Sequence, residues 1–260
     1  MSTELGNEFS TSEWMQRIQD ARAKADAEHA RRLRDDPDYR DKCEAEEAER
    51  LAKEQAKADA EKRAEWVRAR ADLVDRGIPM KDVEAILGGT LKDTAALNVA
   101  RGWFAHPGLT VLVLSGTRGC GKTTAASWCV AQEPPRDPLR GDRWFARPAS
   151  ERRYWAPLFV DVTRLQRASR YDQEQMWPFE RAAVLAIDDL GLEYADVKGS
   201  FTALFDGLFN ARYANEMKTV ITTNLTAADF KARYGERVAD RIRECGRFVE
   251  LNDPSLRGVR

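Results

Sequence analysis

The chain has few of the residues on which disulfide and metal chemistry depend. Its 260 residues include two histidines and four cysteines, and no two cysteines form a C-x-x-C pair. This composition argues against a disulfide framework, a zinc knuckle and histidine-based catalysis. No apolar run approaches the roughly 18 residues of a membrane span, and the N-terminus carries no apolar signal core. We therefore expect a reduced, cytoplasmic location and no membrane partner.

The chain also lacks an excess of charge of either sign. Lys and Arg number 42 and Asp and Glu number 43, which gives a net charge of -1. A balanced total produces no global field that would attract nucleic acid, although local basic patches remain compatible with it. The length suffices for one α/β domain with a sizeable core plus an appendage.

We assign the appendage to residues 1–75. From Ser12 to Arg76 the sequence is Ala-rich and charged, with few large apolar residues and no heptad pattern, which predicts solvated helix. Asp36-Pro37-Asp38 divides it, because aspartate is a good N-cap and proline suits a first helical turn, so we expect one helix before it and a longer one after. Two interpretations remain open: a partly disordered arm, or a partner-docking module anchored by Trp14 and Trp66.

One segment fits a phosphate-binding motif in its required context. The apolar run Val111–Leu114 precedes GTRGCGKT, which matches G-x-x-x-x-G-K-[ST], and a helix is expected over 125–130. Glycines let backbone N–H groups approach a phosphate, and the positive N-terminal end of the helix points at it. The residues expected to bind ATP are Gly116, Thr117, Arg118, Gly119, Cys120, Gly121, Lys122, Thr123 and Thr124.

The side chains of this loop predict a magnesium nucleotide. Lys122 would place its charge on the β- and γ-phosphates, and the hydroxyl of Thr123 would coordinate Mg²⁺. Asp188 ends the apolar run 182–187, which is typical of a strand buried on both faces, and is the expected second Mg²⁺ ligand.

Two further polar residues are expected to act in catalysis together with Lys122 and Asp188. Asp189 could polarise the attacking water. Asn224 follows the apolar strand 219–222 and would lie at the same carboxyl edge of the sheet, where it could hold the water or contact the γ-phosphate.

The alternation of segments from residue 76 to residue 260 predicts a P-loop α/β domain, with a parallel sheet flanked by helices. The composition changes at Arg76-Gly-Ile-Pro79, where we place its start. We expect Thr163 to cap the helix after the second strand. Strands are predicted over 111–114, 158–162, 182–187 and 219–222, and helices over 93–105, 199–215 and 226–244, the last with a break at Gly235.

Residues 134–157 have the composition of an insertion into this domain. Arginines alternate with aromatic residues there, which is the chemistry of single-stranded nucleic-acid binding, so single-stranded DNA is an expected partner. The alternative is a proline-rich loop whose aromatic residues pack on the domain. The residues concerned are Arg136, Arg140, Arg143, Arg147, Arg152, Arg153, Trp144, Phe145, Tyr154 and Trp155.

Four segments taken together resemble a known family. GTRGCGKT, AVLAIDDLG, TVITTNLT and YGERVADRIRECG follow in this order, and the chain from about residue 77 to residue 257 resembles the AAA+ ATPases of the DnaC/IstB type. That family comprises helicase loaders and ATP-dependent transposition helpers. The resemblance implies an ATP- and Mg²⁺-dependent ATPase that forms a homo-oligomeric ring or spiral, binds DNA, and has a replicative helicase or a transposase as partner.

The resemblance also implies a shared site. Arg241 occupies the position of the family's arginine finger, which acts on a neighbouring subunit's ATP, and Arg237 would support it. Such an arginine stabilises transition-state charge and makes assembly a condition for turnover. Gly77-Ile-Pro79 resembles the segment that lies over the adenine. Aspartate at position 189, where many AAA+ ATPases have glutamate, implies slow hydrolysis.

Three functions therefore compete. The first is an ATPase of helicase-loader type that controls a replication partner, with the transposition helper as its variant. The second is a small-molecule phosphotransferase, which would need an acceptor pocket and an arginine-rich lid. The third is a non-hydrolysing, nucleotide-dependent adaptor in which the charged arm acts. The intact phosphate loop, the aspartate pair and the TTN motif favour the first.

Overall fold

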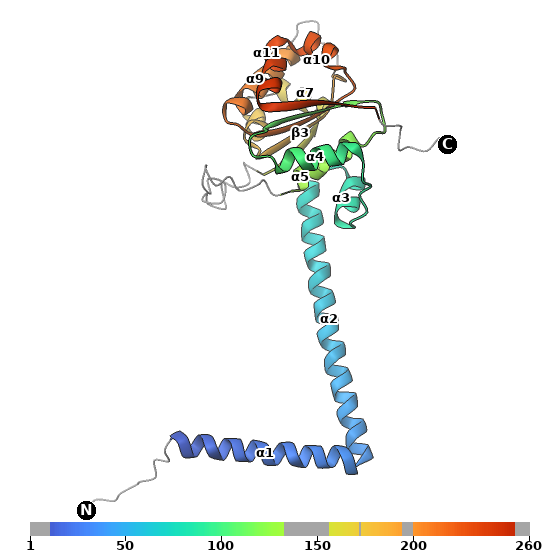
Figure 1. Cartoon of the computed structure of the whole chain (residues 1–260), viewed down its shortest axis with the longest axis vertical. Coiled ribbons are helices and arrows are strands. Elements are labelled where there is room, and N and C mark those ends of the chain that lie inside the picture. Colours follow the sequence, from blue (N-terminus) through green and yellow to red (C-terminus); the bar gives the residue numbers. More distant parts are fainter. Residues whose placement is uncertain (1–10, 133–155, 172, 194–199, 253–260) are drawn as a thin grey trace, which may run out of the picture. The chain divides into compact units, whose positions relative to one another are not determined.

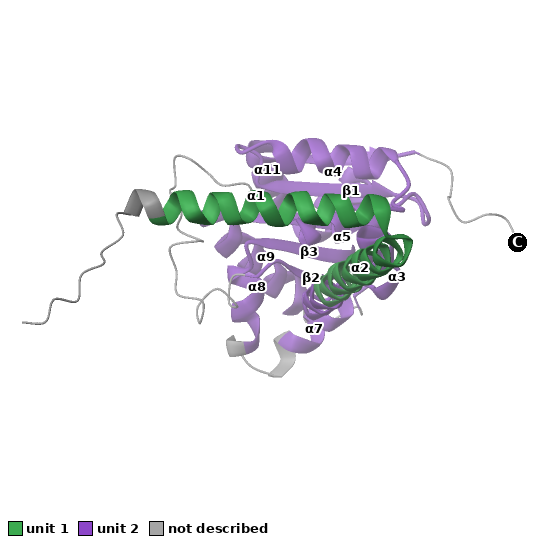
Figure 2. Ribbon diagram, turned by 90° about the horizontal axis from the view of Figure 1, so that it is seen from below, with its two compact units in different colours: residues 1–65 green, residues 66–260 purple. Residues whose placement is uncertain are grey.

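The structure is a computed structural model that describes residues 11–132, 156–171, 173–193 and 200–252. Its internal contacts divide the chain into two units, residues 1–65 and 66–260 (Figure 2). No helix in these described ranges is long and apolar enough to cross a membrane.

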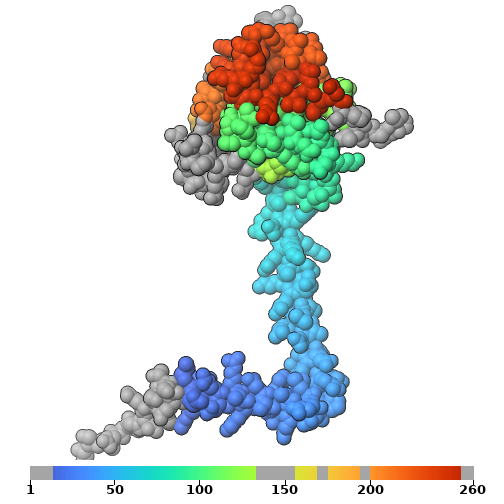
Figure 3. Space-filling view, in the orientation of Figure 1, coloured from blue at the N-terminus to red at the C-terminus, as the bar shows by residue number. Residues whose placement is uncertain are grey.

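The described part of the first unit, from residue 11 onward, is helical. Helix α1 covers Thr11–Asp35, and α2 covers Pro37–Asp75 and so continues into the second unit. The two helices predicted on either side of Asp36 are therefore present. The carboxylate of Asp36 accepts the backbone N–H of Tyr39 at 3.1 Å, which satisfies a free donor in the first turn of α2. Figure 3 shows side chains projecting along both helices, and most are exposed, as a solvated helix requires.

The second unit contains a five-stranded sheet in which all paired strands run parallel. The strand order is β2-β3-β4-β1-β5. Figure 1 shows this sheet with α9, α10 and α11 on one side and α4 and α5 on the other. The four predicted strands are present, and the fifth was not predicted. The strands are β1 (Val111–Gly116), β2 (Leu158–Asp161), β3 (Val184–Leu190), β4 (Lys218–Thr223) and β5 (Gly246–Leu251).

Helices cover both faces of this sheet, and each face has its own apolar core. Leu112 and Leu114 of β1 pack with α3, α4 and α5, whereas Val111 and Val113 face α7, α9, α10 and α11. This alternation follows from the two-residue period of a strand. The helices are α3 (Met80–Leu87), α4 (Ala95–Ala105), α5 (Lys122–Ala131), α7 (Val162–Tyr171), α8 (Trp177–Arg181), α9 (Ser200–Ala214), α10 (Ala227–Tyr234) and α11 (Glu236–Cys245), with a 3₁₀ turn at Gln173–Met176.

Helix boundaries confirm one detailed prediction and correct another. Gly235, with φ +91°, separates α10 from α11 at the predicted break. The prediction that Thr163 caps α7 was wrong. The helix begins at Val162, and Asp161 accepts the N–H of Arg164 at 2.9 Å, so the aspartate that ends β2 caps the helix instead.

Candidate nucleotide-binding site

The loop between β1 and α5 requires glycine at both of its ends. Gly116 has φ +147°, and a Cβ there would lie 2.5 Å from the carbonyl oxygen of Leu251. Gly121 has φ +89°, and a Cβ there would lie 3.2 Å from Oγ1 of Thr94. Helix α5 begins directly after it, at Lys122. The loop therefore turns tightly into a helix N-terminus, which is the geometry that backbone phosphate binding requires.

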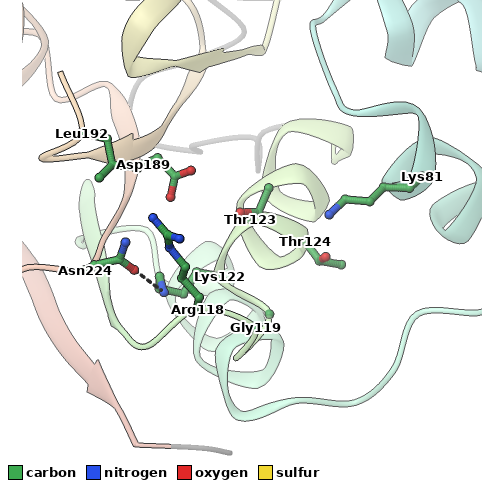
Figure 4. Close-up of a pocket in the computed structure, with 10 residues that line it drawn as sticks. Lys81, Arg118, Gly119, Lys122, Thr123, Thr124, Asp189, Leu192 and Asn224 are labelled. Carbon is green, nitrogen blue, oxygen red and sulfur yellow. Dashed lines mark hydrogen bonds between the residues drawn. The ribbon is translucent and has the colours of Figure 1, made fainter. Parts of the chain in front are cut away.

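A cavity of about 400 Å³ lies against this loop (Figure 4). It opens at the carboxyl ends of β1, β3 and β4, the edge at which open α/β sheets bind ligands. Three of its side chains are cationic and one is anionic, a balance that suits a polyphosphate. Its lining residues are Lys81, Arg118, Gly119, Gly121, Lys122, Thr123, Thr124, Asp189, Leu192 and Asn224.

Lys122 is held in place by neutral acceptors. Its side chain is buried, and Nζ donates to the carbonyl oxygens of Gly116 and Thr117 at 2.7 and 2.9 Å and to Oδ1 of Asn224 at 3.2 Å. Within the described residues no carboxylate pairs with this ammonium group. Its charge is therefore uncompensated at the cavity, which favours an anionic ligand.

Asp188 lies beside the loop, where its side chain is only 7% exposed. Oγ1 of Thr123 donates to its two carboxylate oxygens at 3.1 and 3.2 Å, and Oγ1 of Thr222 donates to Oδ1 at 2.5 Å. Burial, with a smaller effect from the charge of Asp189, raises the pKa of Asp188; the hydrogen bonds from Thr222 and Thr123 oppose this rise, and the resulting pKa is about 6. The raised pKa therefore reflects mainly the removal of this carboxylate from water.

The predicted magnesium ligands fit that ion. Thr123 and Asp188 bring a hydroxyl and a carboxylate together at the cavity, and Mg²⁺ prefers oxygen ligands, of which the protein usually supplies one or two. Substrate phosphates and water complete such a shell. In the part of the chain that the structure describes, no cluster of three His, Cys, Asp or Glu residues could hold a metal.

Asp189 and its neighbour Thr222 form the next part of the site. Asp189 lines the cavity and has φ +57°, an uncommon conformation for a residue with a side chain. Its N–H donates to Oγ1 of Thr222 at 2.9 Å. Thr222 thus holds both aspartates, and the sequence analysis missed this role. The signal was the threonine that precedes Asn224 by two residues in TTN.

A second missed residue is Asp82 of α3. Its carboxylate is 3% exposed and accepts hydrogen bonds from Oγ1 of Thr124 and from Oγ of Ser127, each at 2.9 Å. The hydroxyl of Thr124 is thereby turned toward α3, so the backbone of Thr124 is the part left to bind phosphate. No local motif in the sequence identifies this carboxylate.

Some predicted residues lie away from the cavity. Cys120 is buried, and its Sγ donates to the carbonyl oxygen of Thr117 at 3.1 Å, so it supports the loop from inside. The guanidinium carbon of Arg241 lies 4.9 Å from the ring centroid of Tyr213, and Nη1 is buried without a hydrogen-bond partner among the described residues. Arg237 pairs with Asp206. Residues 134–155, with the predicted arginines and aromatics, lie outside the described residues.

The topology decides the fold class. Five parallel strands in the order β2-β3-β4-β1-β5 carry a phosphate loop between β1 and α5. This is the P-loop NTPase fold, with a parallel sheet flanked by helices. The predicted fold class is therefore confirmed.

Several solved structures have a fold similar to that of this chain. The DnaC helicase loader is 22% identical, with 63% of this chain and 94% of that chain covered and a TM-score of 0.45. DnaI is 22% identical (65% and 87% covered, TM-score 0.44), and the replication initiator DnaA bound to AMPPCP and single-stranded DNA is 15% identical (61% and 45%, TM-score 0.42). No protein-family model and no curated protein matches the chain. The likeness concerns the fold.

Proposed function

We propose that this protein is a DNA-dependent ATPase of the AAA+ helicase-loader type, which uses bound ATP to control a replication partner. The observation that carries the proposal is the meeting of Lys122, Asp188 and Asn224 at one sheet edge, although they come from three separate motifs. A cation for the phosphates, a carboxylate for the metal and an amide for the water are the parts that phosphoryl transfer to water needs.

Each residue has a distinct task in this mechanism. The loop N–H groups and Lys122 bind the β- and γ-phosphates, and Thr123 and Asp188 would hold Mg²⁺, which would neutralise charge on those phosphates. Asp189 and Asn224 orient a water in line with the γ-phosphate, and the carboxylate of Asp189 accepts its proton. The short reach of Asp189 predicts slow turnover.

The remaining positive charge is proposed to come from a second copy of the chain. Arg241 stacks on Tyr213 and does not line its own cavity, which supports a role on a neighbouring subunit's nucleotide. Turnover would then require a ring or spiral, and DNA or a partner that promotes assembly would stimulate it. A transposition-helper ATPase would use the same chemistry with a transposase as partner.

One observation keeps a phosphotransferase as the second candidate. A further cavity of about 460 Å³ shares Arg118 and Asn224 with the nucleotide cavity, and Ser115, Thr226 and Glu250 are among its other lining residues. An acceptor molecule placed there could reach the γ-phosphate. Such an enzyme would turn over ATP only when its acceptor is added. The non-hydrolysing adaptor would bind ATP without any turnover.

The testing experiment measures ATP hydrolysis with and without single-stranded DNA over a range of protein concentrations. Lys122→Ala serves as the blank, because it removes the phosphate-binding charge. Specific activity that rises with both DNA and protein concentration supports an assembling, DNA-dependent ATPase. Activity that is indifferent to both, or absent, contradicts the proposal and favours the phosphotransferase or the adaptor.

A further inference from the structure

Helix α3 contributes a wall to the nucleotide cavity that the phosphate-loop motif does not include. Lys81 of α3 lines the cavity, is exposed, and has no carboxylate partner within the described residues. Figure 4 shows its amine pointing toward Thr124. At the other end of the cavity, the guanidinium group of Arg118 points toward Asp189 and Asn224. The two cations therefore occupy opposite ends.

The position of Lys81 is fixed by its neighbour in sequence. Asp82 accepts hydrogen bonds from Thr124 and Ser127 of α5, each at 2.9 Å, and is almost fully buried. A buried carboxylate with two hydroxyl donors is costly to displace, because its removal from these donors would leave a charge unsatisfied. The start of α3 is therefore hydrogen-bonded to the first turns of α5, and this fixes the position of Lys81 in the wall of the cavity.

The polarity of the cavity indicates which part of a nucleotide Lys81 meets. Asp189 and Asn224 lie at the same end of the cavity, where the γ-phosphate would be attacked (Figure 4). Thr124 lies at the end away from them, one residue beyond the proposed magnesium ligand Thr123. A nucleotide whose γ-phosphate lies near Asn224 would run toward Thr124 with its β- and then its α-phosphate.

We propose that Lys81 binds the α-phosphate of the bound nucleotide and that Asp82 is the positioning residue that holds Lys81 there. This inference rests on the proposed function, since it assumes a nucleotide in this cavity. It adds a binding residue from outside the phosphate loop and assigns the buried Asp82 carboxylate a function. It also predicts that ATP and ADP depend equally on Lys81, because both carry an α-phosphate.

The test compares the affinities for MgATP and MgADP of the full chain by calorimetric titration. Lys81→Met should weaken the binding of each nucleotide about 10-fold, because one charge-assisted hydrogen bond is lost. The ratio of the two affinities should stay unchanged. Arg118→Ala, at the opposite end of the cavity, should weaken the binding of ATP more than the binding of ADP. Lys231→Met is the matched control, since Lys231 is an exposed lysine of α10 that pairs with Glu236.

A double-mutant cycle tests the positioning role. If Asp82 acts through Lys81, Asp82→Asn should weaken both nucleotides, and the double variant Lys81→Met/Asp82→Asn should bind no more weakly than Lys81→Met. Asp82→Asn keeps the size of the side chain and one carbonyl acceptor, so the fold is retained even where Asp82→Ala would unfold. If the two fold-losses in nucleotide affinity multiply in the double variant, the positioning role of Asp82 is overturned.

The outcomes separate this inference from the proposed function. Wild-type protein that binds both nucleotides, with Lys81→Met binding as tightly as wild type, overturns the role of Lys81 and leaves the nucleotide site intact. A loss of affinity for ATP alone places Lys81 at the γ-phosphate and also overturns its proposed role at the α-phosphate. Wild-type protein that binds neither nucleotide overturns both proposals. Equal losses for ATP and ADP, with no further loss in the double variant, support it.

Discussion

Nζ of Lys122 donates to Oδ1 of Asn224 at 3.2 Å, although 102 positions separate the two residues in the sequence. The bond joins the phosphate loop after β1 to the end of β4. A γ-phosphate would compete with Asn224 for the same ammonium group, and Asn224 would then be free to contact a water or the phosphate. This pair therefore links ligand binding to the placement of a catalytic amide.

Thr222→Val should slow turnover and destabilise the domain. The hydroxyl of Thr222 donates to Asp188 and accepts from the N–H of Asp189, and valine preserves its shape but makes neither hydrogen bond. We expect ATP turnover to fall roughly 10-fold and the free energy of unfolding to fall by about 1–3 kcal/mol, because buried groups lose their partners. Steady-state hydrolysis and chemical denaturation measure the two effects.

Thr226→Val is the matched control for Thr222→Val. Thr226 also ends a strand-to-helix link, but it caps α10 through Asp229 and does not touch the aspartate pair. The substitution should lower the free energy of unfolding by about 1 kcal/mol and leave ATP turnover unchanged. Equal turnover in wild type and Thr222→Val would show that the aspartates do not depend on this hydroxyl.

Mixing two inactive variants tests whether Arg241 acts on a neighbouring subunit. Arg241→Ala keeps its own phosphate loop, and Asp188→Ala keeps its finger, so a mixed assembly should contain some complete sites. We expect ATP hydrolysis to return in part when the variants are mixed under assembling conditions. The control mixture of Lys122→Ala with Asp188→Ala contains no intact nucleotide site and should stay inactive. No recovery in the first mixture counts against a shared site.

Lys218 should give the stability of the domain a distinct pH dependence. Burial lowers the pKa of Lys218 to about 8, while its Nζ donates to the carbonyl oxygens of His106 and Leu109. The unfolded chain, with an ordinary lysine pKa of 10.5, binds more protons than the folded chain between about pH 8 and 10.5. The free energy of unfolding should therefore rise through this window, by about 1–3 kcal/mol.

The measurement compares denaturation of wild type and of Lys218→Met at several pH values between 8 and 10. The variant has no titrating group at this position, so its free energy of unfolding should not show the rise with pH that wild type shows. Lys42→Met, at an exposed position of α2, is the control and should follow wild type. Parallel curves for wild type and Lys218→Met would rule out a lowered lysine pKa.

Local patterns predicted the parts of this protein that are built from contiguous residues. The spacing of the loop glycines with Lys122 indicated the strand, turn and helix, and the apolar run before Asp188 indicated a buried strand. Both signals exist within about ten residues, because backbone geometry and burial on two faces constrain neighbouring positions directly.

The missed features depend on partners far along the chain. Asp82 bonds residues 42 and 45 positions later, and Thr222 bonds Asp188 across 34 positions, so neither pairing has a local signature. Strand β5 lies at the sheet edge and only its last residue is buried, so it lacks the continuous apolar run that identified β3. Helix α3 is only 8 residues long, too short for a clear helical period.

The central claim is that Lys122 and its loop bind the phosphates of ATP. Titration of MgATP into the full chain, followed by calorimetry, tests it most directly, with circular dichroism to verify that each variant is folded. The account predicts one binding site per chain in wild type and in Lys231→Met, and binding about 30–100-fold weaker in Lys122→Ala, the loss of a charged hydrogen-bonding group. Absence of binding in wild type, or equal binding in Lys122→Ala, would contradict the account.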